Sequence, residues 1–197
     1  MQFVPFEKDI EVNGQTVYAI IDGMAAFKSI GKRFLLEAGI GEEVKGEYKI
    51  DPNGWYSHEM WLKAFERIAK EIGENTLYQI GIKIPKNAKF PPWVNNIENA
   101  IKSIDVAYHM NHRKNNVALF NQKTGEILEG IGHYGFEKVQ GENMIISECN
   151  NPYPCSFDRG IITTMAKKFE STASILHDDS KPCRRKGKYS CTYTIRW

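Results

Sequence analysis

The sequence predicts an α+β domain in which N-terminal helices pack on a small antiparallel sheet, with one further helix inserted between strands. Two observations predict this class. Apolar residues recur every three or four positions through much of the first 112 residues, as in amphipathic helices. After that point, shorter and alternating apolar runs are separated by turn residues, as in strands, and helical spacing returns once, at residues 157–169.

Three helices are expected in the N-terminal half, over residues 16–39, 57–73 and 94–112. Gly31 is a candidate break in the first helix, and Ser57 is a good N-cap for the second. The segment 76–84 fits a strand or a short helix equally well, so the pattern leaves its structure open.

The strands are expected in two groups on either side of the helix at 157–169. The first group resembles an antiparallel meander whose turns contain Gly125 and Gly141. The second group ends in a strand that alternates apolar and polar residues. The expected strands cover residues 117–120, 125–135, 138–148, 173–177 and 190–197.

The composition predicts one domain over residues 1–197, because 42% hydrophobic residues in a chain of this length can supply a core. A net charge of +2 argues against a nucleic-acid partner, which requires a concentrated positive surface. The sequence begins without a basic, then apolar, leader and contains no apolar run of membrane-spanning length. We therefore expect a cytoplasmic protein without a membrane span.

All four cysteines lie in the last third of the chain, as two pairs around the expected helix. Five residues separate Cys149 from Cys155, and seven separate Cys183 from Cys191. In a reducing cytosol these residues are expected as thiols or thiolates. Paired thiolates on two loops are a common way to build a tetrahedral zinc site. Free buried thiols and a redox-active pair are the alternatives.

This tail resembles the 4-vinyl-reductase (V4R) domain family and the small-molecule-sensing domains of phenol- and xylene-responsive activators. The resemblance covers about residues 60–197. It divides the chain into an N-terminal extension with the first helix (1–55) and a ligand-binding part (56–197). The matching pattern is a cysteine before a helix, a glycine in its first turn, and Cys-x₃-Gly-x₃-Cys before an aromatic strand: Cys155, Gly160, Cys183, Gly187, Cys191 and Tyr193.

The resemblance implies a sensory domain for a hydrophobic or aromatic small molecule, with a structural zinc near its pocket. Cys155, Cys183 and Cys191 take the three cysteine positions. The family's acidic ligand is replaced by Ser180, so Cys149 is the favoured fourth ligand, and the alternatives are His177, Asp178 and Asp179. The resemblance also implies a homodimer, and a downstream protein partner would have to receive the signal.

Aromatic residues and two histidines are the candidates for contacting the ligand. His109 and His112 lie three residues apart near the end of the expected third helix, where Asp105 would orient His109. Ordinary core packing, and stabilisation of the helix C-terminus, are the competing explanations. The candidate ligand-binding residues are Trp61, Phe65, Tyr78, Trp93, Tyr108, His109 and His112.

No phosphate-binding loop, nucleophile elbow or zinc-protease motif occurs, so no catalytic residue is predicted and a non-enzymatic role is favoured. The alternative is an enzyme or haem-based protein that binds or acts on a tetrapyrrole-like planar molecule. In a haem-based sensor, His109 or His112 would be the axial ligand.

Overall fold

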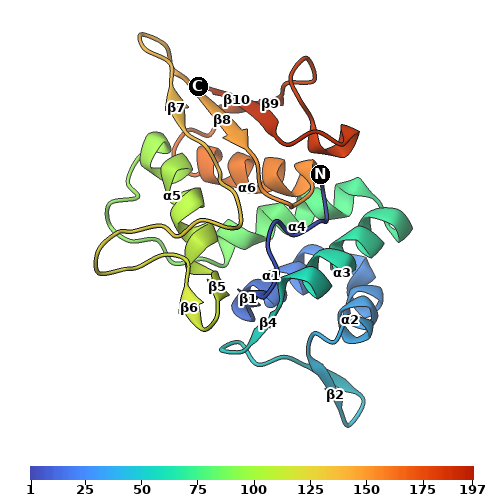
Figure 1. Ribbon diagram of the computed structural model, residues 1–197. Helices are drawn as coiled ribbons and strands as arrows, with labels where there is room; N and C mark the ends of the chain where they lie inside the picture. Colours follow the sequence, from blue (N-terminus) through green and yellow to red (C-terminus); the bar gives the residue numbers. More distant parts are fainter.

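The computed structural model describes residues 1–197, and Figure 1 shows helices grouped beneath a C-terminal sheet. Two short 3₁₀ helices accompany the α-helices, η1 at Ala25–Phe27 and η2 at Arg184–Lys186. The α-helices are α1 (Gln15–Gly23), α2 (Lys28–Glu37), α3 (His58–Glu71), α4 (Glu74–Lys86), α5 (Ile97–Met110) and α6 (Cys155–Lys167).

The strands form three antiparallel sheets, with the orders β4-β1-β5-β6, β7-β8-β10-β9 and β2-β3. All are short, and the longest have six residues. Their bounds are β1 (Ile10–Asn13), β2 (Glu42–Val44), β3 (Glu47–Lys49), β4 (Trp55–Ser57), β5 (His112–Lys114), β6 (Val117–Ala118), β7 (Glu137–Lys138), β8 (Met144–Cys149), β9 (Ser174–His177) and β10 (Cys191–Arg196).

The C-terminal sheet is built around β10, which pairs with β8 and β9. Cys191 lies opposite Cys149, and Tyr193 lies opposite both Ser147 and His177. The alternation of β10 turns Tyr193 and Ile195 inward, where they are fully buried. Helix α6 connects β8 to β9 and runs beneath the sheet (Figure 1).

Helices α4 and α6 cross at two glycines that let their backbones approach closely. A Cβ atom on Gly81 would lie 2.1 Å from the carbonyl oxygen of Phe157, and one on Gly160 would lie 2.4 Å from that of Tyr78. No larger residue fits at either position without separating the helices. This crossing fixes α4 against α6, and the C-terminal end of α4 and residues along the whole of α6 line the cavity described below.

The N-terminal segment belongs to the fold, because β1 is an inner strand of its sheet. Strand β1 pairs with β4, which leads into α3, and with β5, which follows α5. A single hydrophobic core of 40 buried residues extends from Ile10 to Ile195. We therefore propose one domain over residues 1–197.

The predicted α+β class is confirmed, and the ambiguous segment 76–84 lies in helix α4. The single helix expected over residues 16–39 is wrong: α1 and α2 are separated by η1, where Ala25 has a φ of 45°. The break does not occur at Gly31, which lies inside α2. A Cβ atom on Gly31 would lie 2.0 Å from the sulfur of Met24, so this glycine accommodates the methionine.

The expected strand over residues 125–135 is also absent. Only two isolated bridges form there, Phe120 with Ile127 and Tyr134 with Cys149. Gly130 and Gly132 have φ values of 128° and 73°, which turn the chain away from extended geometry. Strands β1 to β4 were not predicted, because segments of three or four residues show too little alternation. None of the helices has the length and apolar character needed to cross a lipid bilayer.

Candidate functional site

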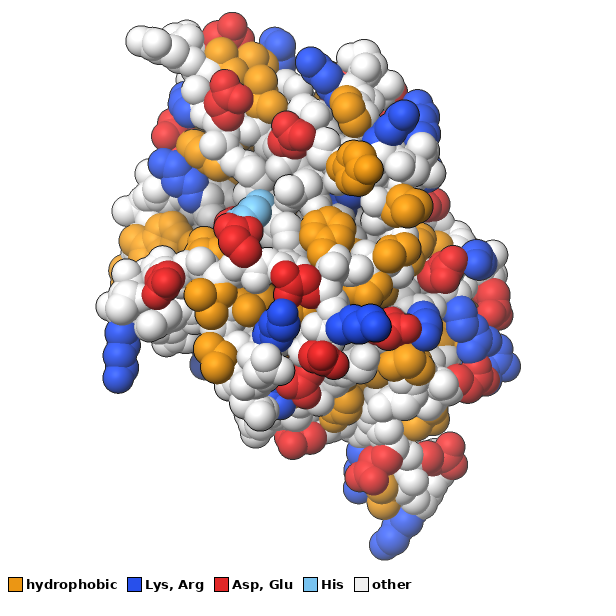
Figure 2. All heavy atoms as spheres, viewed as in Figure 1, with side chains coloured by type: hydrophobic (Ala, Val, Ile, Leu, Met, Phe, Trp, Pro, Cys, Tyr) orange, Lys and Arg blue, Asp and Glu red, His pale blue; other side chains and the backbone are white.

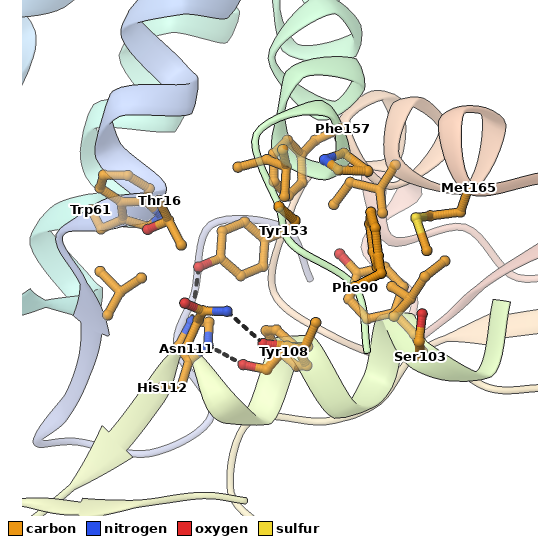
Figure 3. Close-up of a pocket in the computed structure, with 18 residues that line it drawn as sticks. Thr16, Trp61, Phe90, Ser103, Tyr108, Asn111, His112, Tyr153, Phe157 and Met165 are labelled. Carbon is orange, nitrogen blue, oxygen red and sulfur yellow. Dashed lines mark hydrogen bonds between the residues drawn. The ribbon is translucent and has the colours of Figure 1, made fainter. Parts of the chain in front are cut away.

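An apolar cavity of about 100 Å³ lies where the helices converge, and 13 of its 18 lining residues are hydrophobic (Figure 3). Its apolar end is formed by side chains from α6 and from the loop between α4 and α5. Its other end approaches α3 and the end of α5. The main contributors are Phe90, Phe157, Ile161 and Met165 at the apolar end, and Thr16, Trp61, Asn111, His112 and Tyr153 at the other.

The second end of the cavity carries an ordered set of hydrogen-bonding groups. His112 Nδ1 lies 2.7 Å from the carbonyl oxygen of Tyr108, so Nδ1 carries the proton and donates it. Nε2 of His112 therefore accepts from the hydroxyl of Tyr153, at 3.0 Å. The indole Nε1 of Trp61 is buried and makes no hydrogen bond of ordinary geometry, although it is near enough to the Tyr153 hydroxyl to oppose the burial that raises the pKa of Tyr153. The cavity thus offers an unused donor beside a fixed histidine–tyrosine pair.

The cavity lining is uncharged, because no Lys, Arg, Asp or Glu side chain contributes to it. Burial lowers the pKa of His112 to about 4, although its bond to the Tyr108 backbone acts in the opposite direction. Burial also raises the pKa of Tyr108 and of Tyr153. All three side chains are neutral near pH 7, so the cavity favours an uncharged ligand.

A fully buried ion pair between Asp158 and Arg184 lies behind the cavity. The hydroxyl of Tyr134 donates to Asp158 Oδ1 at 2.6 Å, and Arg184 Nη1 donates to the carbonyl oxygen of Tyr153 at 2.8 Å. Burial raises the pKa of Asp158 to about 6, against the lowering effect of Arg184. Tyr134 and Tyr153 both line the cavity, so the ion pair supports its wall.

Three of the four cysteines converge with His177 at the end of the C-terminal sheet. We call Cys155, His177, Cys183 and Cys191 the cysteine–histidine group. Their sulfur and nitrogen atoms all lie within 4.8 Å of one another. The Cys155 sulfur is 3.0 Å from that of Cys191 and 3.7 Å from that of Cys183. These residues come from α6, β9, the residue before η2 and β10.

The group is ordered by hydrogen bonds to its sulfurs. The Cys155 thiol donates to Cys191, which lowers the pKa of Cys191 and raises that of Cys155. The Arg184 backbone N–H also donates to the Cys191 sulfur, at 3.3 Å. His177 Nδ1 lies 3.2 Å from Asp179, whereas its Nε2 is buried without a hydrogen-bond partner. This arrangement can hold a thiol-binding metal ion or undergo thiol oxidation.

Cys149, the favoured fourth ligand, lies outside this group. It is opposite Cys191 in the sheet, but its sulfur contacts the hydroxyl of Ser147 at 3.6 Å. Burial raises the pKa of Cys149, so its thiol stays protonated. His177, one of the sequence-based alternatives, lies with the other three cysteines instead.

Of the seven predicted ligand-binding residues, the structure brings Trp61, Tyr108 and His112 to the cavity. The other four do not line it. Phe65 packs in the core against Phe157, and Tyr78 lies on α4 under Arg159. Trp93 is 43% exposed. His109 is buried beside Asp105 and His133.

Sequence reasoning missed the segment that closes the cavity between β8 and α6. Tyr153 and Phe157 stack at a ring distance of 5.2 Å, and both line the cavity. The signal was the proline on each side of Tyr153, which indicates a rigid loop before a helix. Asn111 and Thr16 were also missed, because neither residue type stands out at a helix end.

Solved structures with this fold include H-NOX proteins. An H-NOX protein from S. oneidensis in the Fe(II)NO ligation state has 14% identity and a TM-score of 0.62, over 93% of this chain and 98% of that one. An oxygen-binding H-NOX domain related to soluble guanylate cyclases has 15% identity and a TM-score of 0.60, over 93% and 94%. A structure from a study of haem distortion in the H-NOX family has 14% identity and a TM-score of 0.64, over 94% of both chains.

The sequence itself matches no protein-family model and no curated protein. At 12–15% identity, the structural likeness establishes the fold of this chain. The V4R resemblance is therefore wrong, because the solved structures that match are H-NOX domains. Zinc, which that resemblance implied, has no support in these structures, whose descriptions name iron or haem. Of the sequence-based alternatives, the comparisons favour the haem-based one.

The cavity does not fit a haem. Pockets for drug-sized ligands usually have about 300–1,000 Å³, and haem, a macrocycle, exceeds many such ligands, whereas this cavity has about 100 Å³. Haem also carries two carboxylates, and no cationic side chain lines the cavity. His112 is oriented as an iron ligand would be, through its bond to a backbone carbonyl, but its Nε2 is occupied by Tyr153.

Replacing Arg184 with Met should test the buried ion pair. The change leaves the Asp158 carboxylate buried without its cation, so we expect the free energy of unfolding to fall by about 3–5 kcal/mol at pH 8. Urea denaturation measures this loss. Arg185→Met, at the exposed neighbouring position, is the matched control and should change stability by less than about 0.5 kcal/mol. Equal losses in the two variants would contradict the role of the pair.

The buried neutral His112 should make stability depend on pH. Its folded-state pKa of about 4 lies below the unfolded value of about 6.5, so between these values only the unfolded chain binds the proton. Its contribution is therefore complete above pH 6.5 and is lost as pH falls toward 4. The stability difference between wild type and His112→Gln, from urea denaturation, should shrink by about 2–3 kcal/mol between pH 7.5 and 4.5. A pH-independent difference would refute this account.

Proposed function

We propose that this protein is a sensory domain that binds a small, uncharged, largely apolar molecule directly in the cavity. The observation that carries this proposal is the unpartnered indole N–H of Trp61 at the end of an uncharged apolar cavity. A buried donor without a partner is costly, and a ligand oxygen that accepts its hydrogen bond removes that cost.

The size of the cavity supports a ligand with few atoms. An engineered apolar cavity of about 150 Å³ in another protein holds benzene. The cavity here has about 100 Å³, so a five-membered ring or a smaller molecule is the matching size. The similar H-NOX structures are themselves described with small ligands, O₂ or NO, and the description of the NO structure also names iron.

The two ends of the cavity support a ligand with one polar group. In Figure 3 the ring of Tyr153 directs its hydroxyl toward the side of Trp61, Asn111 and His112, whereas Phe90 and Met165 lie on the other side. A carbonyl or hydroxyl oxygen fits the first side, and a hydrocarbon body fits the second.

A route from the cavity to the protein surface supports a sensory role. Tyr134 and Tyr153 join the cavity wall to Asp158 and Arg184, and Arg184 in turn bonds to Cys191. A ligand that moves either tyrosine changes the support of this buried ion pair. The homodimer, the downstream protein partner and the cytoplasmic location stay predictions.

A pair of ligands that differ in one group tests the proposal. Cyclopentanone and methylenecyclopentane have nearly the same shape, but only the ketone accepts a hydrogen bond. In Trp61→Phe we expect the affinity for the ketone to fall about 3- to 10-fold more than that for the alkene, the value of one hydrogen bond. Isothermal titration calorimetry measures both dissociation constants.

Trp93→Phe is the matched control, because Trp93 is exposed and lies outside the cavity. It should leave both affinities unchanged. The proposal fails if the wild-type protein binds neither compound, or if Trp61→Phe weakens both equally.

We further propose that the cysteine–histidine group binds a metal ion with a preference for thiolates. Three sulfurs and one imidazole are the donor set that soft and borderline ions select. The convergence of three buried sulfurs with the buried Nε2 of His177, which makes no hydrogen bond of ordinary geometry, supports this.

Elemental analysis of the purified protein tests the metal site. We expect one equivalent of metal in wild type and in Cys149→Ser, and a loss of most of it in Cys183→Ser. Cys149→Ser is the matched control, because this buried cysteine lies outside the group. A metal-free wild type would leave free thiols or a redox pair, and metal retained in Cys183→Ser would place the ion elsewhere.

A further inference from the structure

A second group of metal-binding side chains lies on the other side of α5, away from the cavity and the cysteines. Asp105 projects from α5 toward the loop that follows β6. Its Oδ1 accepts the backbone N–H of Tyr134 at 2.9 Å, and its Oδ2 lies 3.1 Å from His133 Nδ1. The loop therefore fixes the carboxylate, which is 18% exposed, next to an imidazole.

His109 lies one helical turn after Asp105 and completes this group. Its side chain is fully buried, with Nδ1 2.8 Å from the Asp105 carbonyl oxygen and 3.6 Å from Asp105 Oδ1. Its Nε2 has no hydrogen-bond partner. One nitrogen of each histidine and one oxygen of Asp105 all lie within 4.8 Å of one another. A purely structural hydrogen-bond network accounts for the position of His133 between the carboxylates of Asp105 and Glu129. It does not account for the buried Nε2 of His109, which stays without a partner.

On the outer side of the group, His133 has the carboxylate partner that a metal-bound imidazole usually has. His133 Nε2 lies 3.0 Å from the carboxylate of Glu129, so with Nδ1 on a metal, Nε2–H would donate to this carboxylate. Metal-binding histidines almost always donate their second N–H in this way. The His133 side chain is 32% exposed and Glu129 is 80% exposed, which gives an ion access from solvent. In the view of Figure 2, a small patch of histidine surface lies next to acidic side chains.

We propose that Asp105, His109 and His133 form a binding site for a divalent transition-metal ion, with Glu129 orienting His133 from outside. Two imidazoles and one carboxylate suit such ions, with bonds of about 2.0–2.2 Å. In a tetrahedron, bonds of about 2.1 Å place neighbouring ligand atoms about 3.4 Å apart. The 3.1 Å between His133 Nδ1 and Asp105 Oδ2 is close to that spacing, and one ligand atom from each of the three residues lies within 4.8 Å of the others. Three protein ligands leave at least one position for water or a small ligand.

Cobalt(II) is the probe that separates this site from the cysteine–histidine group. Bound to nitrogen and oxygen ligands, it gives weak visible bands, whereas bound to thiolates it adds strong sulfur-to-metal charge transfer in the near ultraviolet. We expect chelator-treated wild-type protein to bind one cobalt(II) ion that gives only the weak visible bands. Any cobalt(II) bound by the cysteine–histidine group is recognised separately by its charge-transfer bands. In His133→Gln, the affinity for that ion should fall at least about 10-fold, since loss of an outer partner alone costs 10–100-fold.

Glu126→Gln is the matched control, because it removes an exposed carboxylate from the same loop without touching the group. It should bind cobalt(II) as wild type does. Asp105→Asn gives a second measurement on another ligand and should weaken the same bands. The proposal is overturned if wild-type protein shows no cobalt(II) that gives weak visible bands without charge transfer. It is also overturned if His133→Gln and Asp105→Asn show these bands as strongly as wild type does.

Discussion

The buried ion pair between Asp158 and Arg184 is the interaction on which both functional regions of this structure depend. Both side chains are completely removed from solvent, so each requires the other to offset the loss of its hydration. Asp158 anchors α6 and Tyr134, whereas Arg184 reaches Tyr153 and, through its backbone, the sulfur of Cys191. One charge pair therefore holds the wall of the cavity and the cysteine–histidine group in fixed relation.

The features that could be predicted from the sequence are those that leave a periodic or compositional pattern in it. Long amphipathic segments such as α3 and α5 were located, and the convergence of Cys155, Cys183 and Cys191 was expected. The structure places His177, and not Cys149, beside the other three cysteines, because strand register decides which side chains meet and spacing does not show it. Tyr153 was missed because a loop residue enters the cavity only once β8 and α6 are packed.

The same fold holds iron in its structural relatives, but the contents of this cavity differ. Aromatic rings from Tyr108, Tyr153 and Phe157 occupy the centre of the molecule, and the remaining space is small and uncharged. A fold alone does not determine what is bound, because the ligand is selected by the side chains placed on it. Here those side chains provide one free donor and a hydrocarbon surface, which suit a small organic molecule better than a charged macrocycle.

The most direct test of this account is a titration of the purified protein with haem, followed by visible absorption in both iron oxidation states. We expect no saturable one-to-one shift of the Soret band, because neither the volume nor the charge of the cavity suits haem. A stoichiometric shift that is present in wild type and lost in His112→Ala would contradict the account. It would show that Tyr153 gives up His112 to iron and that the cavity opens to hold the macrocycle.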